Sequence, residues 1–310
     1  DDFVLGSRFL KEQTELGGKQ VSPDDLAPDI REYYLNKIVS PAVLSLPDVQ
    51  FQQEQYSFKN LLFIKAGILK ESLKSGNFCD KVFRFIKNRI GDNLKKEYRR
   101  LQIKPDFNRK FIYAPLNYQP ESTTSPLGGR FVDQLLMLEV LAASIPDDWH
   151  IYVKEYPLQW KPRGISYSDY RYRGYYTAIS KMKNTHLVPL DANTYDLIDK
   201  SQAVATVNST AGWEAALRFK PSLVFGYAWY SHCPGVFHIN GEESCKKIIE
   251  KIQNSSFKNN RQNLLNYLAA FERVSIRGYT DIYLKGAVKV SVEESAENYF
   301  QAISGALKEN

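Results

Sequence analysis

Between residues 111 and 225, short apolar runs alternate with segments in which apolar residues recur at helical spacing. The apolar runs, each a strand candidate, are 111–116, 150–154, 185–190, 203–207 and 222–225. The helix candidates between them are 131–145, 170–182, 193–198 and 213–219. Strands that alternate with helices of this length are typical of a right-handed, doubly wound parallel sheet. The pattern therefore predicts an α/β, Rossmann-like domain over about residues 106–245.

The two flanking regions, residues 1–105 and 246–310, show mainly helix candidates in their sequence pattern. Residues 1–105 carry four prolines before residue 48 and then a proline-free stretch, 56–101, with apolar residues at helical spacing and a break at 75–77. The tail contains three helix candidates, 245–252, 262–273 and 293–307. We expect a mainly helical N-terminal region over 1–105 and a helical tail over 246–310 that packs on the sheet domain.

Charge is concentrated in the N-terminal region. Residues 58–110 contain fifteen Lys or Arg against five Asp or Glu, a net of +10, whereas the whole chain carries +6. Such a basic helical region could contact an anionic membrane surface or a charged polymer, or could simply be a solvated helix face. Nucleic acid is disfavoured because no recognised binding motif accompanies the charge.

Composition excludes several classes of protein. The 310 residues are 43% hydrophobic and 25% charged, as in soluble globular proteins, and no apolar run approaches the length needed to span a bilayer. The three cysteines, Cys79, Cys233 and Cys245, lie far apart, which argues against a disulfide framework or a zinc site. We expect a cytoplasmic protein, at the inner face of the cytoplasmic membrane if the basic region contacts lipid.

Polar residues gather in the loops that follow the predicted strands. These loops are 117–124, 154–157, 208–212 and 226–230. Because the carboxyl ends of parallel strands share one edge of the sheet, the loops could line a single crevice. Known phosphate and nucleophile motifs are absent, since the chain has no GxxxxGK[ST], GxGxxG or GxSxG sequence.

The strand–turn–helix at residues 203–219 suits a phosphorylated ligand. Its turn, Asn208-Ser209-Thr210-Ala211-Gly212, offers hydroxyls and free backbone N–H groups at a helix N-terminus. The same residues also suit an ordinary N-cap, and both roles can coexist. Lys154, at the end of the second strand, could neutralise the phosphate as a point cation, although it could equally be a surface lysine.

The remaining candidates have weaker signals. Glu214, in the first helical turn, could accept hydrogen bonds from ribose hydroxyls or could simply favour the helix N-terminus. Glu121, in a proline-kinked loop, is a candidate for acid–base chemistry or a plain loop residue. We place Gly212, Gly226 and Tyr227 with the donor-binding residues. Further candidates for the crevice are Gln119, Thr124 and Arg163.

Four segments together resemble the capsule polysaccharide biosynthesis family, which includes the Kdo transferases of capsule and lipopolysaccharide assembly. They are Tyr118-Gln119-Pro120-Glu121 with Thr123-Thr124, Val153-Lys154-Glu155-Tyr156-Pro157, Ser209 to Ala215, and Phe225 to Tyr230. The resemblance covers about residues 105–240 and implies the nucleotide-binding half of a GT-B glycosyltransferase. It also implies a CMP-linked donor of Kdo or a related acidic sugar. We expect no metal or other cofactor, because side chains and the helix N-terminus would supply the positive charge that the phosphate needs.

The chain departs from the family pattern in two places. Tyr156 stands where the family usually has the His of a Lys-Glu-His-Pro motif, which in related enzymes contacts the donor phosphate and can protonate the leaving group. Tyr156 is thus a catalytic candidate by position, but a tyrosine, with an ordinary pKa of about 10, is a poorer acid than a histidine in neutral water. Residues 1–105 do not read as a second α/β domain, which GT-B enzymes have.

The sequence favours a glycosyltransferase that moves a sugar from a nucleotide donor to a surface polysaccharide or glycolipid. Two alternatives stay open. One is a UDP- or GDP-sugar transferase or an epimerase-like enzyme of the same fold, and the other is a catalytically inactive assembly protein of capsule biosynthesis. A thermal-shift assay with a panel of nucleotides would distinguish the two enzyme hypotheses, because a bound nucleotide raises the stability of the protein. Transfer or hydrolysis of a donor by purified protein would count against the inactive assembly protein.

Overall fold

The computed structural model describes residues 15–16, 19–38, 66–67, 69–80, 82–83, 94–119, 124–157, 159, 171–254, 260–279 and 290–308. Contacts divide the chain into two compact units, one formed by residues 79–261 and the other by residues 1–78 and 262–310. The boundaries expected at 105 and 245 remain predictions. The structural division differs from them because α6 (Leu94–Leu101) packs on α9 and β3, and α12 (Glu242–Gln253) packs on α8, which all belong to the sheet unit.

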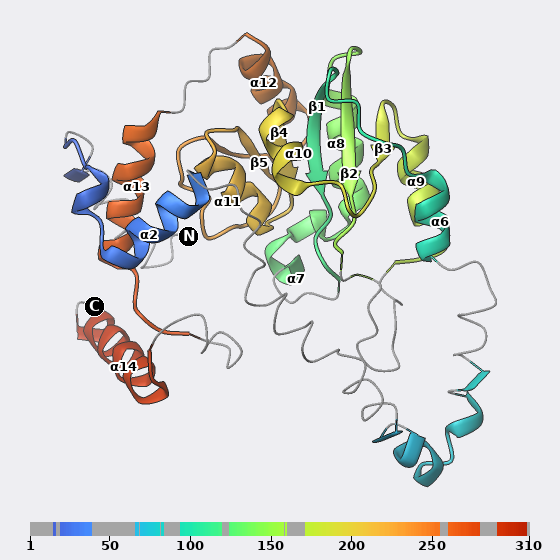
Figure 1. The fold of residues 1–310 in the computed structure, drawn as a ribbon, viewed down its shortest axis with the longest axis horizontal. Helices are drawn as coiled ribbons and strands as arrows, with labels where there is room; N and C mark the ends of the chain where they lie inside the picture. Colours follow the sequence, from blue (N-terminus) through green and yellow to red (C-terminus); the bar gives the residue numbers. More distant parts are fainter. Residues whose placement is uncertain are drawn as a thin grey trace. The chain divides into compact units, whose positions relative to one another are not determined.

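A six-stranded sheet forms the centre of the unit 79–261 (Figure 1). Its strands are β1 (Lys110–Pro115), β2 (Trp149–Lys154), β3 (Thr185–Leu187), β4 (Ala203–Thr206), β5 (Ser222–Val224) and β6 (Val236–His238). Their order is β3-β2-β1-β4-β5-β6, and every neighbouring pair is parallel. The predicted Rossmann-like α/β class is confirmed.

Helices cover both faces of this sheet. One buried cluster joins the strands to α6, to α8 (Gln134–Ser144), to α9 (Tyr175–Lys181) and to α12. A second cluster, on the opposite face, includes residues of α10 (Thr194–Lys200) and α11 (Thr210–Leu217). Because both faces are covered, the central strands are buried almost throughout and read as continuous apolar runs in the sequence.

Side-chain caps mark the starts of two helices, α10 and α8. The Asn193 side chain accepts hydrogen bonds from the N–H groups of Tyr195 (2.9 Å) and Asp196 (3.2 Å), as predicted for an N-cap. Asp133 caps α8 by accepting from the N–H of Leu135 at 3.0 Å. The strand β6 was not predicted, because it has three residues, lies at the sheet edge and follows β5 without an intervening helix.

The other unit joins segments from both ends of the sequence. Its described elements are η1 (Pro23–Asp25), α2 (Pro28–Ile38), most of α13 (Arg261–Val274) and α14 (Val292–Lys308). The Gln262 side chain donates to the carbonyl of Val21 at 3.0 Å, and the Asn266 side chain donates to the carbonyl of Leu16 at 3.1 Å. These bonds tie the segment before α2 to α13. Within the described parts of the chain, no helix is both long and apolar enough to cross a membrane.

Two histidines form a pair on β2 and β3. Nδ1 of His150 lies 3.1 Å from Nε2 of His186, and the Arg109 guanidinium lies 3.1 Å from Nε2 of His150. Partial burial lowers the pKa of both histidines below 6.5, with the Arg109 charge acting in the same direction and Asp106 and Asp148 opposing it at His150.

We expect this pair to make stability depend on pH. A histidine whose folded-state pKa is depressed contributes stability that is fully present above 6.5 and is lost as the pH falls. Thermal melts between pH 7.5 and pH 5, roughly the range in which histidine titrates, should show falling stability. The variant His150→Gln with His186→Gln should show a shallower decline, and an identical pH profile would contradict the assignment.

Candidate functional site

The polar loops meet at the point where the strand order reverses. From β1 the chain runs to β2 and β3 on one side, and β4, β5 and β6 follow on the other. In open α/β sheets a ligand crevice lies beside such a switch point, at the carboxyl ends of the strands. Here the switch point lies between the loops that follow β1 and β4.

The side chain of Asn117 joins these two loops. Its Nδ2 donates to Oδ1 of Asn208 at 3.0 Å, and its Oδ1 lies 3.2 Å from Oγ1 of Thr206. The Thr206 hydroxyl is fully buried and also lies 2.9 Å from Oγ of Ser209. The structure thus brings the predicted candidates Asn208 and Ser209 beside the loop after β1.

Gln134, the first residue of α8, fixes the backbone of Asn117. The N–H of Asn117 donates to Oε1 of Gln134 at 2.7 Å, and Nε2 of Gln134 donates back to the Asn117 carbonyl at 3.2 Å. Both residues are buried. With its peptide groups satisfied in this way, Asn117 holds its amide side chain toward the loop after β4.

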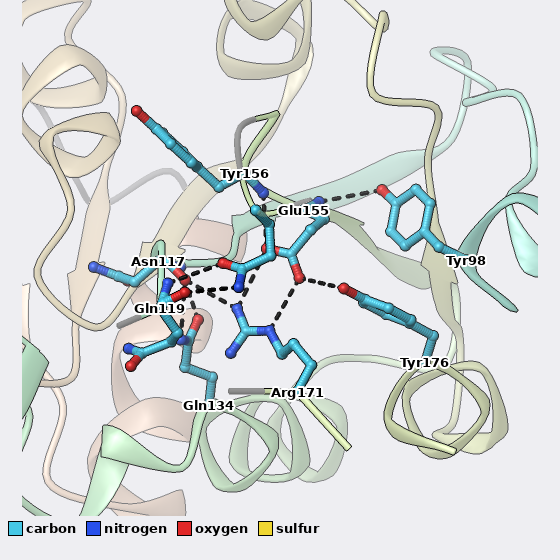
Figure 2. Close-up of polar contacts among 9 residues, drawn as sticks. Tyr98, Asn117, Gln119, Gln134, Glu155, Tyr156, Arg171 and Tyr176 are labelled. Atoms are coloured by element: carbon cyan, nitrogen blue, oxygen red, sulfur yellow. Dashed lines mark hydrogen bonds and ion pairs between the residues drawn. The ribbon is translucent and has the colours of Figure 1, made fainter. Parts of the chain in front are cut away.

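A buried ion pair anchors the loop after β2 (Figure 2). The Arg171 guanidinium donates to the Glu155 carboxylate at 3.0 and 3.3 Å, and the Tyr176 hydroxyl donates to the same carboxylate at 2.7 Å. Arg171 also donates to the carbonyl of Asn117 at 2.9 Å. One guanidinium therefore links the loops after β1 and β2.

Arg171 and Tyr176 in this cluster each keep one protonation state. Burial opposes charge on Arg171, yet the Glu155 carboxylate keeps the pKa of Arg171 above its ordinary value. Burial, with the charge of Glu155, raises the pKa of Tyr176, so this hydroxyl stays protonated as a donor. The Tyr98 hydroxyl accepts a hydrogen bond from the N–H of Glu155 at 3.1 Å and donates one to the carbonyl of Val188. These groups are therefore suited to positioning the loops rather than to exchanging protons.

A second amide pair lies further along the same loops. The N–H of Gln119 donates to Oε1 of Gln159 at 2.9 Å, and Nε2 of Gln159 donates to the Gln119 carbonyl at 2.8 Å. Nε2 of Gln119 donates to the hydroxyl of Thr124, at the start of α7 (Thr124–Leu127), at 2.8 Å. The predicted crevice residues Gln119 and Thr124 are thus in contact.

The N-terminus of α11 opens beside these loops. Ser209 occupies the N-cap position, but its side chain makes no capping hydrogen bond. Its carbonyl accepts from the hydroxyl of Tyr230, and Thr210 next to it is exposed. Since the first N–H groups of a helix carry partial positive charge, this end suits a phosphate oxygen better than a capped helix would.

The two glycines in the predicted set have packing reasons of their own. A Cβ at Gly212 would come within 2.7 Å of Oγ of Ser222 and would clash with the Tyr230 hydroxyl. A Cβ at Gly226 would come within 2.8 Å of the Leu127 carbonyl. Both glycines let backbone elements approach closely, and their role in donor binding remains a prediction.

Lys154 lies inside the unit rather than on its surface. Its ammonium donates to the carbonyl of Ala192 at 2.6 Å and to Oγ1 of Thr194 at 2.9 Å, just after β3. Burial lowers its pKa to about 8, which still leaves it protonated in neutral water. It adds positive charge at this edge of the sheet, and direct contact with a phosphate remains a prediction.

Three of the other candidates, Tyr156, Glu214 and Tyr227, lie after β2, in α11 and after β5. Figure 2 shows the Tyr156 ring pointing away from the ion pair, and its centroid lies 5.4 Å from that of Tyr118. Glu214 is half-buried in α11, and Tyr227 is half-exposed after β5. Glu121 and Arg163 lie outside the described residues.

Three residues that organise the site escaped the sequence analysis, namely Gln134, Gln159 and Arg171. Each is a polar residue inside a predicted helix or in an uncharacterised loop, and nothing in the sequence shows that it is buried. Glu155 was noted only as part of a motif. The one usable signal was that a carboxylate directly follows a buried strand, where it needs a cationic partner.

Comparisons with known proteins match most of the sheet unit to a family model. Residues 122–269 match the sequence model of the family described as "Capsule polysaccharide biosynthesis protein". No curated protein matches the chain in sequence. Several solved structures resemble it weakly.

Two of these structures are KpsC chains from Thermosulfurimonas dismutans. The beta Kdo 2,4 transferase is 18% identical, with a TM-score of 0.36 over 55% of this chain and 48% of that one. The beta Kdo 2,7 transferase is 18% identical, with a TM-score of 0.34 over 65% and 55%. UDP-GlcNAc 2-epimerase from Methanocaldococcus jannaschii is 12% identical, with a TM-score of 0.37 over 59% and 48%. The chain thus spans about half the length of each.

The matched segment contains β2 to β6, the ion pair and the α11 N-terminus, and three of the four motifs noted in the sequence lie wholly or largely within it. The resemblance inferred from those motifs is confirmed. Through this segment, the chain resembles the capsule polysaccharide biosynthesis family.

Proposed function

We propose that this protein is a glycosyltransferase that moves a sugar from a nucleotide donor to a surface polysaccharide or glycolipid acceptor. The resemblance of its motifs favours a CMP-linked donor of Kdo or a related acidic sugar. The family match over residues 122–269 supports a role in capsule polysaccharide biosynthesis. The identity of the donor, the identity of the acceptor and independence from a metal ion are all parts of the proposal.

The observation that carries this proposal is the uncapped N-terminus of α11 at the switch point. Ser209 and Thr210 stand at a helix end whose side-chain cap is missing, next to Asn208 and Asn117. A donor phosphate there would accept hydrogen bonds from hydroxyl and backbone N–H groups. Such donors stabilise the negative charge that develops on the leaving nucleotide.

The remaining roles follow from position. The charge of Lys154 favours an anionic ligand at the same edge of the sheet, and Glu214 would hold the ribose hydroxyls. Tyr156 would give a hydrogen bond to the donor, and Glu121 would serve as general base or orient the acceptor. The exposed cations of α6, Lys96, Arg99 and Arg100, belong to the basic region that we propose contacts an anionic membrane.

We expect the variant Ser209→Ala with Thr210→Ala to lose nucleotide binding while keeping its fold. Calorimetric titration with CMP, UDP and GDP measures the affinity, and circular dichroism measures the fold. Loss of two hydroxyl hydrogen bonds to a charged phosphate should weaken binding by about 100-fold or more.

Ser291→Ala is the matched control, because Ser291 also stands at a helix start, where its hydroxyl accepts from the N–H of Glu294 at 3.0 Å in the other unit. That variant should bind nucleotide normally. Equal affinity in the double variant, or no nucleotide binding by the wild-type protein, would refute the proposal. Preference for UDP or GDP would instead indicate another donor.

A further inference from the structure

Two large aromatic side chains are half-exposed in the loop that follows β5. Tyr227 is 52% exposed and Trp229 is 48% exposed, and Leu127 of α7 is 43% exposed. The N–H of Tyr227 donates to the carbonyl of Leu127 at 2.7 Å, so these two residues are neighbours. Large apolar groups that gather at the surface of a folded protein commonly mark a binding surface.

The Trp229 ring is held by other aromatic rings rather than left mobile. Its centroid lies 4.9 Å from that of Trp213, at an interplanar angle of 55°, and 5.4 Å from that of Tyr230 in an edge-to-face arrangement. Trp213 itself is 4% exposed, and Tyr230 is fully buried. A ligand that covers the exposed part of Trp229 would therefore meet a ring that is already ordered, at a small entropic cost.

The same contacts place Trp229 near the nucleotide site. Trp213 belongs to α11, three residues after Thr210, and side chains in a helix lean toward its N-terminus. Tyr230 reaches the same helix end through its hydrogen bond to the Ser209 carbonyl. On the other side, Tyr227 contacts α7, which belongs to the connection after β1. The aromatic loop therefore lies beside the switch point, between the α11 N-terminus and α7.

We propose that Tyr227 and Trp229 form a stacking platform for a pyranose ring of the saccharide substrate. This inference rests on the proposed glycosyltransferase function and names the part of the substrate that the loop recognises. A pyranose ring has one face of C–H groups and an edge of hydroxyls. The electron-rich faces of Tyr and Trp attract such C–H groups, while the Tyr227 hydroxyl can bond the edge.

Binding of saccharides by Trp229 variants tests the platform. The probes are free Kdo, a Kdo disaccharide and maltohexaose, titrated calorimetrically into the wild-type protein, Trp229→Ala and Trp229→Phe. We expect Trp229→Ala to weaken binding of the preferred probe about tenfold and Trp229→Phe to keep most of the affinity, because phenylalanine retains a stacking face. Tyr33→Ala, which removes a 40% exposed tyrosine from α2, should bind as the wild-type protein does.

A parallel titration with CMP separates this inference from the proposed function. If Trp229→Ala loses saccharide affinity but keeps its affinity for CMP, the platform is supported.

Two results would overturn the platform without affecting the proposed nucleotide site. One is equal saccharide affinity in the wild-type protein and Trp229→Ala, and the other is no binding of any probe by the wild-type protein. Loss of CMP affinity in Trp229→Ala, with saccharide binding unchanged, also overturns it, because the ring would then stack on the base. Competition between a CMP-linked sugar and the disaccharide assigns the pyranose to the donor, and simultaneous binding assigns it to the acceptor.

Discussion

Replacing Arg171 by methionine is expected to lower the free energy of unfolding of the sheet unit by about 3–5 kcal/mol, the usual cost of removing one partner of a buried ion pair. The side chain of Glu155 is fully buried, and that of Arg171 is 3% exposed. Without the guanidinium, the carboxylate would keep its bonds from Tyr176 and from the N–H of Tyr156 but would lose its countercharge. The Asn117 carbonyl would lose a donor as well.

Tryptophan fluorescence in a urea titration measures this effect on the correct unit. All four tryptophans, Trp149, Trp160, Trp213 and Trp229, lie within residues 79–261. The double variant Arg171→Met with Glu155→Gln should be less destabilised than the sum of the two single variants, because it leaves no buried charge uncompensated.

Lys246→Met provides the contrast for Arg171→Met. Lys246 pairs with Glu242 on the exposed surface of α12, and such a pair contributes about 0.3–0.5 kcal/mol. If Arg171→Met cost no more than Lys246→Met, the buried pair would not hold the loops after β1 and β2. Additive single variants would show that the two charges do not act as a unit.

The contrast between the sheet and this ion pair shows what a sequence can reveal. Strands β1, β2, β4 and β5 could be predicted because burial on both faces leaves a contiguous apolar run, which is visible without knowing the neighbouring strands. Strand β6 could not, because its three half-exposed residues acquire strand geometry only from pairing with β5. The start of α10 could be predicted because the Asn193 side chain caps the first turn of the helix that directly follows it in the sequence.

The site follows the same logic. Ser209 and Thr210 could be placed at a helix start because a polar turn after a buried strand is a local signal. The partners Asn117–Asn208 and Glu155–Arg171 are separated by 91 and 16 residues, and only the folded sheet brings each pair together. For Lys154, the sequence revealed the position but not the burial. Its position at a strand end was correctly recognised, but its burial beneath the segment after β3 depends on contacts that no local pattern encodes.

Burial of Lys154 leads to the second large expected effect, a rise in stability with pH. Its pKa is about 8 in the folded protein, against 10.5 ordinarily, because desolvation disfavours the ammonium. Below pH 8 the folded protein bears the full cost of the buried charge. As the pH rises from about 8 to 10.5, the unfolded chain binds more protons at this residue than the folded protein does, so stability should rise by about 3 kcal/mol.

The difference in unfolding free energy between the wild-type protein and Lys154→Met isolates this effect from other groups that titrate at alkaline pH. It should grow by about 3 kcal/mol in favour of the wild-type protein across that interval. The matched variant Lys183→Met removes an ammonium that is 55% exposed and pairs with Asp147, and its difference from the wild-type protein should stay nearly flat. Parallel curves for Lys154→Met and the wild-type protein would mean that the ammonium is solvated. It would then be able to reach a donor phosphate directly, instead of acting on the site through its charge from beneath the loop after β3.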